Sequence, residues 1–98
     1  MPSYKNESTE RLFKVIASIN IAEECRAFFE DLCTIKEIKD MAQRFDTALL
    51  LSEGLSYQNI SKAANVSSAT ICRVNRCLEY GDGGYAIAIN KLNEVENK

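Results

Sequence analysis

The chain has 98 residues, which is enough for one small domain and too few for two independent hydrophobic cores. Hydrophobic residues make up 46% and charged residues 27%, a balance typical of globular proteins and not of collagen-like or disordered chains. The formal net charge of −2 excludes a molecule that is positive all over, although a local basic patch could still bind nucleic acid.

Several further absences narrow the class of protein. No apolar run approaches the roughly 20 residues of a membrane helix, and no basic start precedes an apolar block. We therefore expect a cytoplasmic protein that does not enter a membrane. Histidine, the commonest general base and metal ligand, is missing, and no nucleophilic residue has a base near it that could activate it. The sequence thus predicts no enzyme activity and no metal.

The four cysteines are spaced unlike a metal site. Cys25, Cys33, Cys72 and Cys77 form no C-x-x-C pair, and no histidine can complete a zinc set. We expect four reduced thiols, mostly buried as small apolar groups. A thiol-responsive role for Cys72 stays open as an alternative.

The apolar spacing is helical throughout, since apolar residues recur three or four positions apart and nowhere alternate with polar ones. We expect an all-α domain spanning residues 1–98, with frayed ends at 1–7 and 96–98. The six predicted helices cover about 8–18, 21–32, 35–53, 57–64, 68–80 and 85–95. Short helices leave a thin core in one chain, which an intertwined homodimer would remedy.

Capping residues mark several helix ends. Asn20 with Glu23, and Thr34 with Glu37, match the capping-box spacing, and Gly54 is suited to end the long third helix. The expected inner stripe of that helix consists of Ile38, Met41, Ala42, Phe45, Ala48, Leu49 and Ser52.

The most informative stretch has the spacing of a helix-turn-helix at about 56–79. The first helix of such a motif buries one apolar residue, here Ile60, and then needs a small one, here Ser61. The turn needs a residue that tolerates positive φ, and Asn65 is suited to it. Three further apolar residues follow at the required spacing: Val66, Ile71 and Val74. An ordinary helical hairpin is the alternative.

This motif predicts a DNA-binding face. Small residues at the start of its second helix allow close approach to base edges, and nearby cations can contact phosphates. Residues 55–78 contain three basic residues and no acid, although the whole chain is acidic. The candidate DNA-binding residues are Tyr57, Gln58, Lys62, Ser67, Ser68, Ala69, Thr70, Cys72, Arg73 and Arg76.

Five segments carry a family resemblance: Phe28–Thr34, Met41–Arg44, Ser56–Ile60, Ser68–Val74 and Leu78–Gly81. Over about residues 10–92 the chain resembles the Trp repressor superfamily, most closely its small TrpR-related helix-turn-helix proteins of the YerC/YecD type. The resemblance implies an intertwined homodimer that binds a palindromic operator in double-stranded DNA as a transcription regulator. A helical protein-interaction module is the alternative function.

The resemblance also implies a ligand site, in which two arginines sandwich the indole ring of tryptophan. The equivalent positions are Thr34, Arg44, Thr70, Arg73, Val74 and Cys77. Val74 replaces a glycine that lines the family's pocket, and Cys77 replaces a serine that holds the ligand's amino group. Because a branched side chain takes space that an indole needs, we expect neither tryptophan nor another cofactor. A different small effector stays open.

Overall fold

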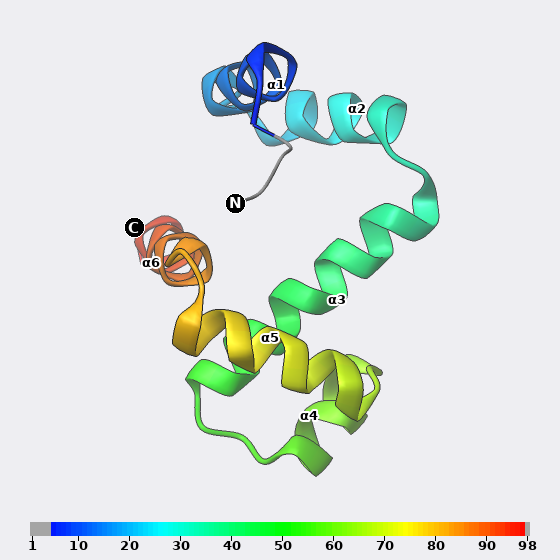
Figure 1. Cartoon of the computed structure of the whole chain (residues 1–98), viewed down its shortest axis with the longest axis vertical. Helices are drawn as coiled ribbons and strands as arrows, with labels where there is room; N and C mark the ends of the chain where they lie inside the picture. Colours follow the sequence, from blue (N-terminus) through cyan, green and yellow to red (C-terminus); the bar gives the residue numbers. More distant parts are fainter. Residues whose placement is uncertain (1–4, 98) are drawn as a thin grey trace. The chain divides into compact units, whose positions relative to one another are not determined.

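The structure, a computed structural model, describes residues 5–97. These residues form helices and no strand, which confirms the all-α prediction (Figure 1). The helices are α1 (Glu7–Ser18), α2 (Ala22–Leu32), α3 (Ile35–Ser52), α4 (Tyr57–Ala64), α5 (Ser68–Tyr80) and α6 (Gly84–Glu96). Within the described part of the chain, no helix is long and apolar enough to cross a membrane.

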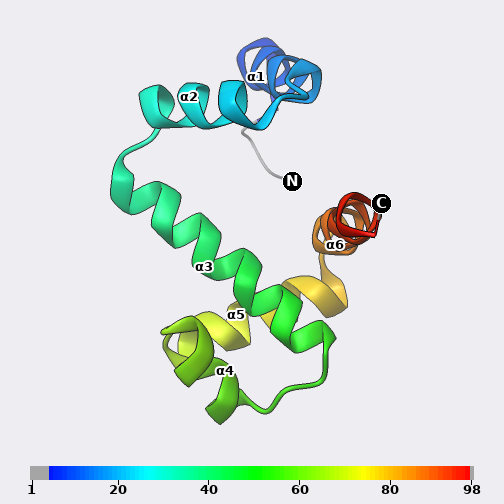
Figure 2. The same ribbon diagram turned by 180° about the vertical axis from the view of Figure 1, so that it is seen from behind.

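Contacts within the chain divide the described residues into two compact units, 5–38 and 39–97. The first unit contains α1 and α2, and the second contains α4, α5, α6 and most of α3 (Figure 2). The division falls inside α3, just after its first turn. The single domain expected for residues 1–98 stays a prediction.

The start of α1 differs from the prediction because a capping box was missed. The Asn6 side chain accepts a hydrogen bond from the Thr9 N–H at 2.9 Å, and the Asn6 N–H donates to the Thr9 hydroxyl at 3.1 Å. Glu7 is therefore helical and Asn6 is its cap, so the frayed end predicted for residues 1–7 is too long by at least these two residues. At the other end, Glu96 still belongs to α6. Residues 1–4 and 98 lie outside the described residues.

The two predicted capping boxes have different outcomes. The Thr34–Glu37 box is confirmed: the Glu37 N–H donates to the Thr34 hydroxyl at 3.1 Å, and the Thr34 N–H donates to the Glu37 carboxylate at 2.8 Å. The box at Asn20 is wrong. The helix begins one residue later than Asn20 could cap, and its N-cap is Ile21, whose hydrocarbon side chain makes no capping hydrogen bond.

The inner stripe predicted for α3 is only partly correct. Ala48 is fully buried as expected, whereas Met41, Ala42 and Ser52 are exposed. Thr47, which the apolar pattern missed, is fully buried, and its hydroxyl donates to the Gln43 carbonyl at 2.8 Å. That bond satisfies a polar group that would otherwise destabilise the interior.

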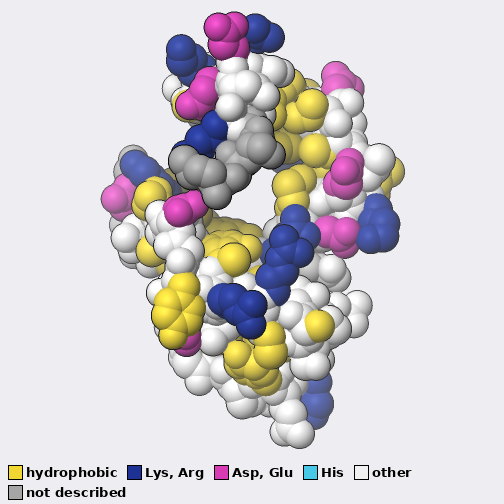
Figure 3. Space-filling view, viewed as in Figure 1, with side chains coloured by type: hydrophobic (Ala, Val, Ile, Leu, Met, Phe, Trp, Pro, Cys, Tyr) yellow, Lys and Arg dark blue, Asp and Glu magenta, His cyan; other side chains and the backbone are white. Residues whose placement is uncertain are grey.

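Among the described residues, those buried in the second unit come from α3, α4 and α5, and α5 also contacts α6 (Figure 1). Ile60 of α4 and Ile71 of α5 are 0% exposed, and Val74 is 1% exposed. None of α1, α2 or α6 has a fully buried residue among those described. Figure 3 accordingly shows many hydrophobic side chains at the surface of a single chain.

The prediction that the cysteines are mostly buried is wrong. Cys25 and Cys33 are half-buried, and Cys72 and Cys77 are exposed, because they lie on helix faces that no other element of the same chain fully covers. All four are free thiols.

Candidate nucleic-acid interface

The sequence places α4 by defining both of its ends. Gly54, with φ +85°, follows the end of α3 and lets the chain turn away from it. Ser56 then caps α4 by accepting a hydrogen bond from the Asn59 N–H at 3.2 Å. Asn65 ends the helix in the left-handed region, with φ 56° and ψ 50°. All three features agree with the sequence predictions.

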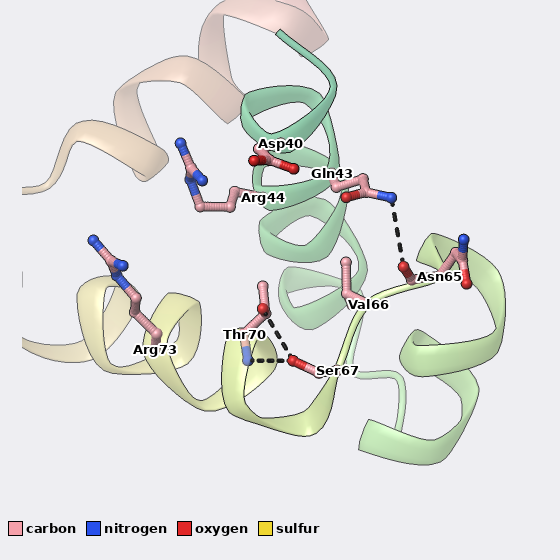
Figure 4. A pocket seen from close by; sticks show the side chains of 8 residues that line it. All are labelled: Asp40, Gln43, Arg44, Asn65, Val66, Ser67, Thr70 and Arg73. Carbon is pink, nitrogen blue, oxygen red and sulfur yellow. Dashed lines mark hydrogen bonds between the residues drawn. The ribbon is translucent and has the colours of Figure 1, made fainter. Parts of the chain in front are cut away.

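The turn into α5 is held by short-range hydrogen bonds. The Ser61 hydroxyl donates to the Val66 carbonyl at 2.8 Å, which joins α4 to the turn. Ser67 caps α5 by accepting from the Thr70 N–H at 3.2 Å, and its hydroxyl donates to the Thr70 hydroxyl at 3.2 Å (Figure 4). Helix, turn and helix therefore follow one another at the predicted residues.

Burial of Ile71 and Val74 decides which side of α5 faces outward. The candidate residues of α5 other than Thr70 lie on the opposite side of the helix and are exposed, whereas Thr70 is half-buried. The candidate residues of α4 are exposed as well. The exposed set consists of Tyr57, Gln58, Lys62, Ser67, Ser68, Ala69, Cys72, Arg73 and Arg76.

A cavity of about 290 Å³ lies between α3 and the start of α5 (Figure 4). Arg44 of α3 and Arg73 of α5 extend toward the same open side of it. Apart from Val66, the residues that line it are polar or charged: Asp40, Gln43, Arg44, Asn65, Ser67, Thr70 and Arg73.

Within the second unit, the structure brings together only part of the ligand site that the resemblance implies. Arg44, Thr70 and Arg73 line the cavity. Val74 is buried in the core beside Ile71, and Cys77 lines a different cavity, of about 480 Å³, near the start of α6. Thr34 caps α3 within the first unit.

Sequence reasoning missed one contact at this cavity. The Gln43 side-chain amide of α3 donates to the backbone carbonyl of Asn65 at 3.4 Å (Figure 4). A polar residue on a long helix gives no signal in the sequence that it reaches a turn 22 positions away. Within residues 5–97, no group of three or more acidic, cysteine or histidine side chains is placed to hold a metal ion.

Comparison with known proteins shows the family of the chain. A family model described as Trp repressor protein matches residues 7–93. The chain belongs to the Trp repressor family. This places it among DNA-binding transcription regulators, and the outward face of α5 in this family member is therefore the candidate interface.

Individual relatives support this family assignment. The protein YerC of Bacillus subtilis (strain 168) is 43% identical over 94 residues, which cover 96% of this chain and 90% of YerC. The crystal structure of a TrpR-like protein from Eubacterium eligens ATCC 27750 matches with a TM-score of 0.86 and 43% identity, covering 90% of this chain and 91% of that one. A second crystal structure, of a protein from Staphylococcus aureus, matches with a TM-score of 0.86 and 35% identity, covering 91% of this chain and 89% of that one.

Proposed function

We propose that this protein regulates transcription by binding a palindromic DNA operator as a homodimer, with α5 in the major groove. The observation that carries the proposal is the outward surface of α5. Ile71 and Val74 anchor the helix in the core, so that its opposite side is free for a groove. Residues 55–78 carry three basic side chains and no acid, which suits a polyanion.

The outward residues divide into two roles. Ser68 and Ala69 are small and exposed in the first turn of α5, which lets the helix end come close to base edges, with Thr70 beside them. Arg73 and Arg76 lie one turn apart on the exposed side of α5 and can contact backbone phosphates. The contacts from α4 come from Tyr57, Gln58 and Lys62, whose side chains are all exposed.

Exposed hydrophobic side chains support the homodimer. Phe13 of α1, Leu32 of α2 and Ile87 of α6 are 49%, 50% and 61% exposed in the single chain. A second copy that covers these helices would bury the surface that one chain leaves in water. Two copies would also present two helix-turn-helix motifs, and the modest charge of each makes simultaneous binding to two half-sites important for affinity.

The proposed regulator does not require tryptophan. Val74 is 1% exposed and fills core space where the family pocket has a glycine. In isothermal titration of the purified protein with tryptophan we expect no binding heat. Saturable heat at micromolar tryptophan would contradict this part of the proposal.

The decisive experiment is selection of genomic DNA fragments by the purified protein, followed by sequencing. We expect a recurring palindrome, and its affinity should fall steeply as salt rises because bound phosphates release counterions. If the recovered fragments share no sequence, and if binding is weak and does not depend on the salt concentration, a helical protein-interaction module would be favoured instead.

A further inference from the structure

We infer that Gln43 is a positioning residue, which fixes the helix-turn-helix against α3 by bonding to the turn. The inference rests on the proposed function, and it supplies what a regulator without a co-repressor needs. Some group of the protein itself must then hold α4 and α5 at the angle that the operator accepts.

The geometry of the contact points to this role. The Gln43 amide donates to the carbonyl of Asn65 at 3.4 Å, across the rim of the cavity between α3 and α5 (Figure 4). Other bonds at the turn, such as those from Ser61 to Val66 and from Thr70 to Ser67, join residues at most five positions apart. Local bonds set the shape of the turn, whereas the Gln43 bond sets its place against α3.

Both ends of the contact are fixed. The Asn65 carbonyl lies past the last residue of α4, where carbonyls lack a partner within the helix and need one from elsewhere. Asn65 holds a left-handed backbone conformation that directs this carbonyl. On α3, the fully buried Thr47 donates to the Gln43 carbonyl at 2.8 Å, so that the backbone carrying the glutamine is anchored in the core.

Loss of this bond should affect selectivity more than binding as such. Operator recognition needs base contacts from the start of α5 and phosphate contacts from Arg73 and Arg76 at the same time. Non-specific binding needs only phosphate contacts, and it tolerates a helix-turn-helix that moves relative to α3. A protein that lacks the Gln43 bond should therefore keep its affinity for unrelated DNA and lose affinity for its operator.

The test compares Gln43→Met, which keeps the length of the side chain but removes the donor, with Gln43→Lys, which keeps a donor. Binding of each variant is measured to the selected palindrome and to a shuffled duplex, together with the melting temperature. Because the bond is a neutral one at the surface, we expect Gln43→Met to bind the palindrome about threefold to tenfold more weakly, with shuffled-duplex binding unchanged and the melting temperature lowered by only a few degrees. Gln43→Lys should keep the palindrome-to-shuffled ratio of the unmodified protein.

Three results would overturn the inference. They are unchanged palindrome affinity in Gln43→Met, an equal loss on both duplexes with a lower melting temperature, and a loss in Gln43→Lys as large as in Gln43→Met. The second would mean that residue 43 acts through general stability, and the third would mean that a hydrogen-bond donor at residue 43 is not what preserves operator affinity.

A second measurement needs no DNA and separates this inference from the proposed function. The chain has two glutamines, and Gln58 on the exposed surface of α4 is the internal control. By ¹⁵N relaxation, the side-chain amide of Gln43 should be clearly more ordered than that of Gln58. Equal mobility of the two amides would refute the bond even if the protein binds an operator. A more ordered Gln43 amide would support the bond even if no operator is found.

Discussion

At the scale of single residues, phosphate contacts and base contacts should respond differently to mutation. Arg73 is exposed on the outward side of α5, where it can meet the DNA backbone. We expect Arg73→Ala to weaken binding to all duplexes alike and to lower the slope of log affinity against log salt by about one. Gel shifts over a salt series would measure both. Arg11→Ala on α1 removes the same charge elsewhere and should leave the slope unchanged.

Thr70 should behave in the opposite way, because it lies at the start of α5 and is half-buried beside the capping Ser67. We expect Thr70→Ala to alter the preference among half-site sequences by about 1–3 kcal/mol at one base position, with little change on shuffled DNA. Selection from a randomised operator library would reveal the shift. The same preferred sequence for both proteins would show that Thr70 reads no base.

Ile71 should matter for stability and not for contact with DNA. It is 0% exposed, so truncation leaves a cavity in the core of the second unit. We expect Ile71→Ala to lower the free energy of unfolding by about 2–5 kcal/mol, measured by urea denaturation. The exposed neighbour Cys72 is the control, and Cys72→Ala should change stability by less than about 0.5 kcal/mol. Equal effects would mean that the assigned core is wrong.

At the scale of elements, the left-handed turn residue offers a clean test. Asn65 adopts φ 56°, which costs an alanine about 1–2 kcal/mol and a glycine almost nothing. We therefore expect Asn65→Ala to lower the melting temperature and Asn65→Gly to leave it nearly unchanged. If both variants melt like the unmodified protein, α4 does not end in the left-handed region.

Helix ends also show how far local signals reach. Ser56, Thr34 and Asn65 act within a few residues of their own positions, and the sequence predicted them correctly. The error at Asn20 is instructive, because a matching capping-box spacing does not force the helix to begin there. Ile21 takes the N-cap although it has no polar side chain, and so the start of α2 depends on more than local hydrogen bonds.

At the scale of the whole molecule, the proposal requires a dimer. In analytical ultracentrifugation we expect a species of twice the mass of one chain. Leu32→Glu should shift it toward the monomer, because a carboxylate would be buried without a partner. Tyr57 is 40% exposed on the proposed DNA-binding surface, and Tyr57→Glu should leave the dimer intact. A monomeric unmodified protein would contradict the proposed dimer.

The sequence by itself determined the helical class, the helix-turn-helix and the outward side of α5, because these depend on periodicity and on contacts a few residues apart. Only the tertiary structure decided that Thr47 is buried, that the cysteines are not, and that Gln43 reaches Asn65. Burial and long-range hydrogen bonds depend on which faces of separate helices come together. No spacing along a single helix specifies that.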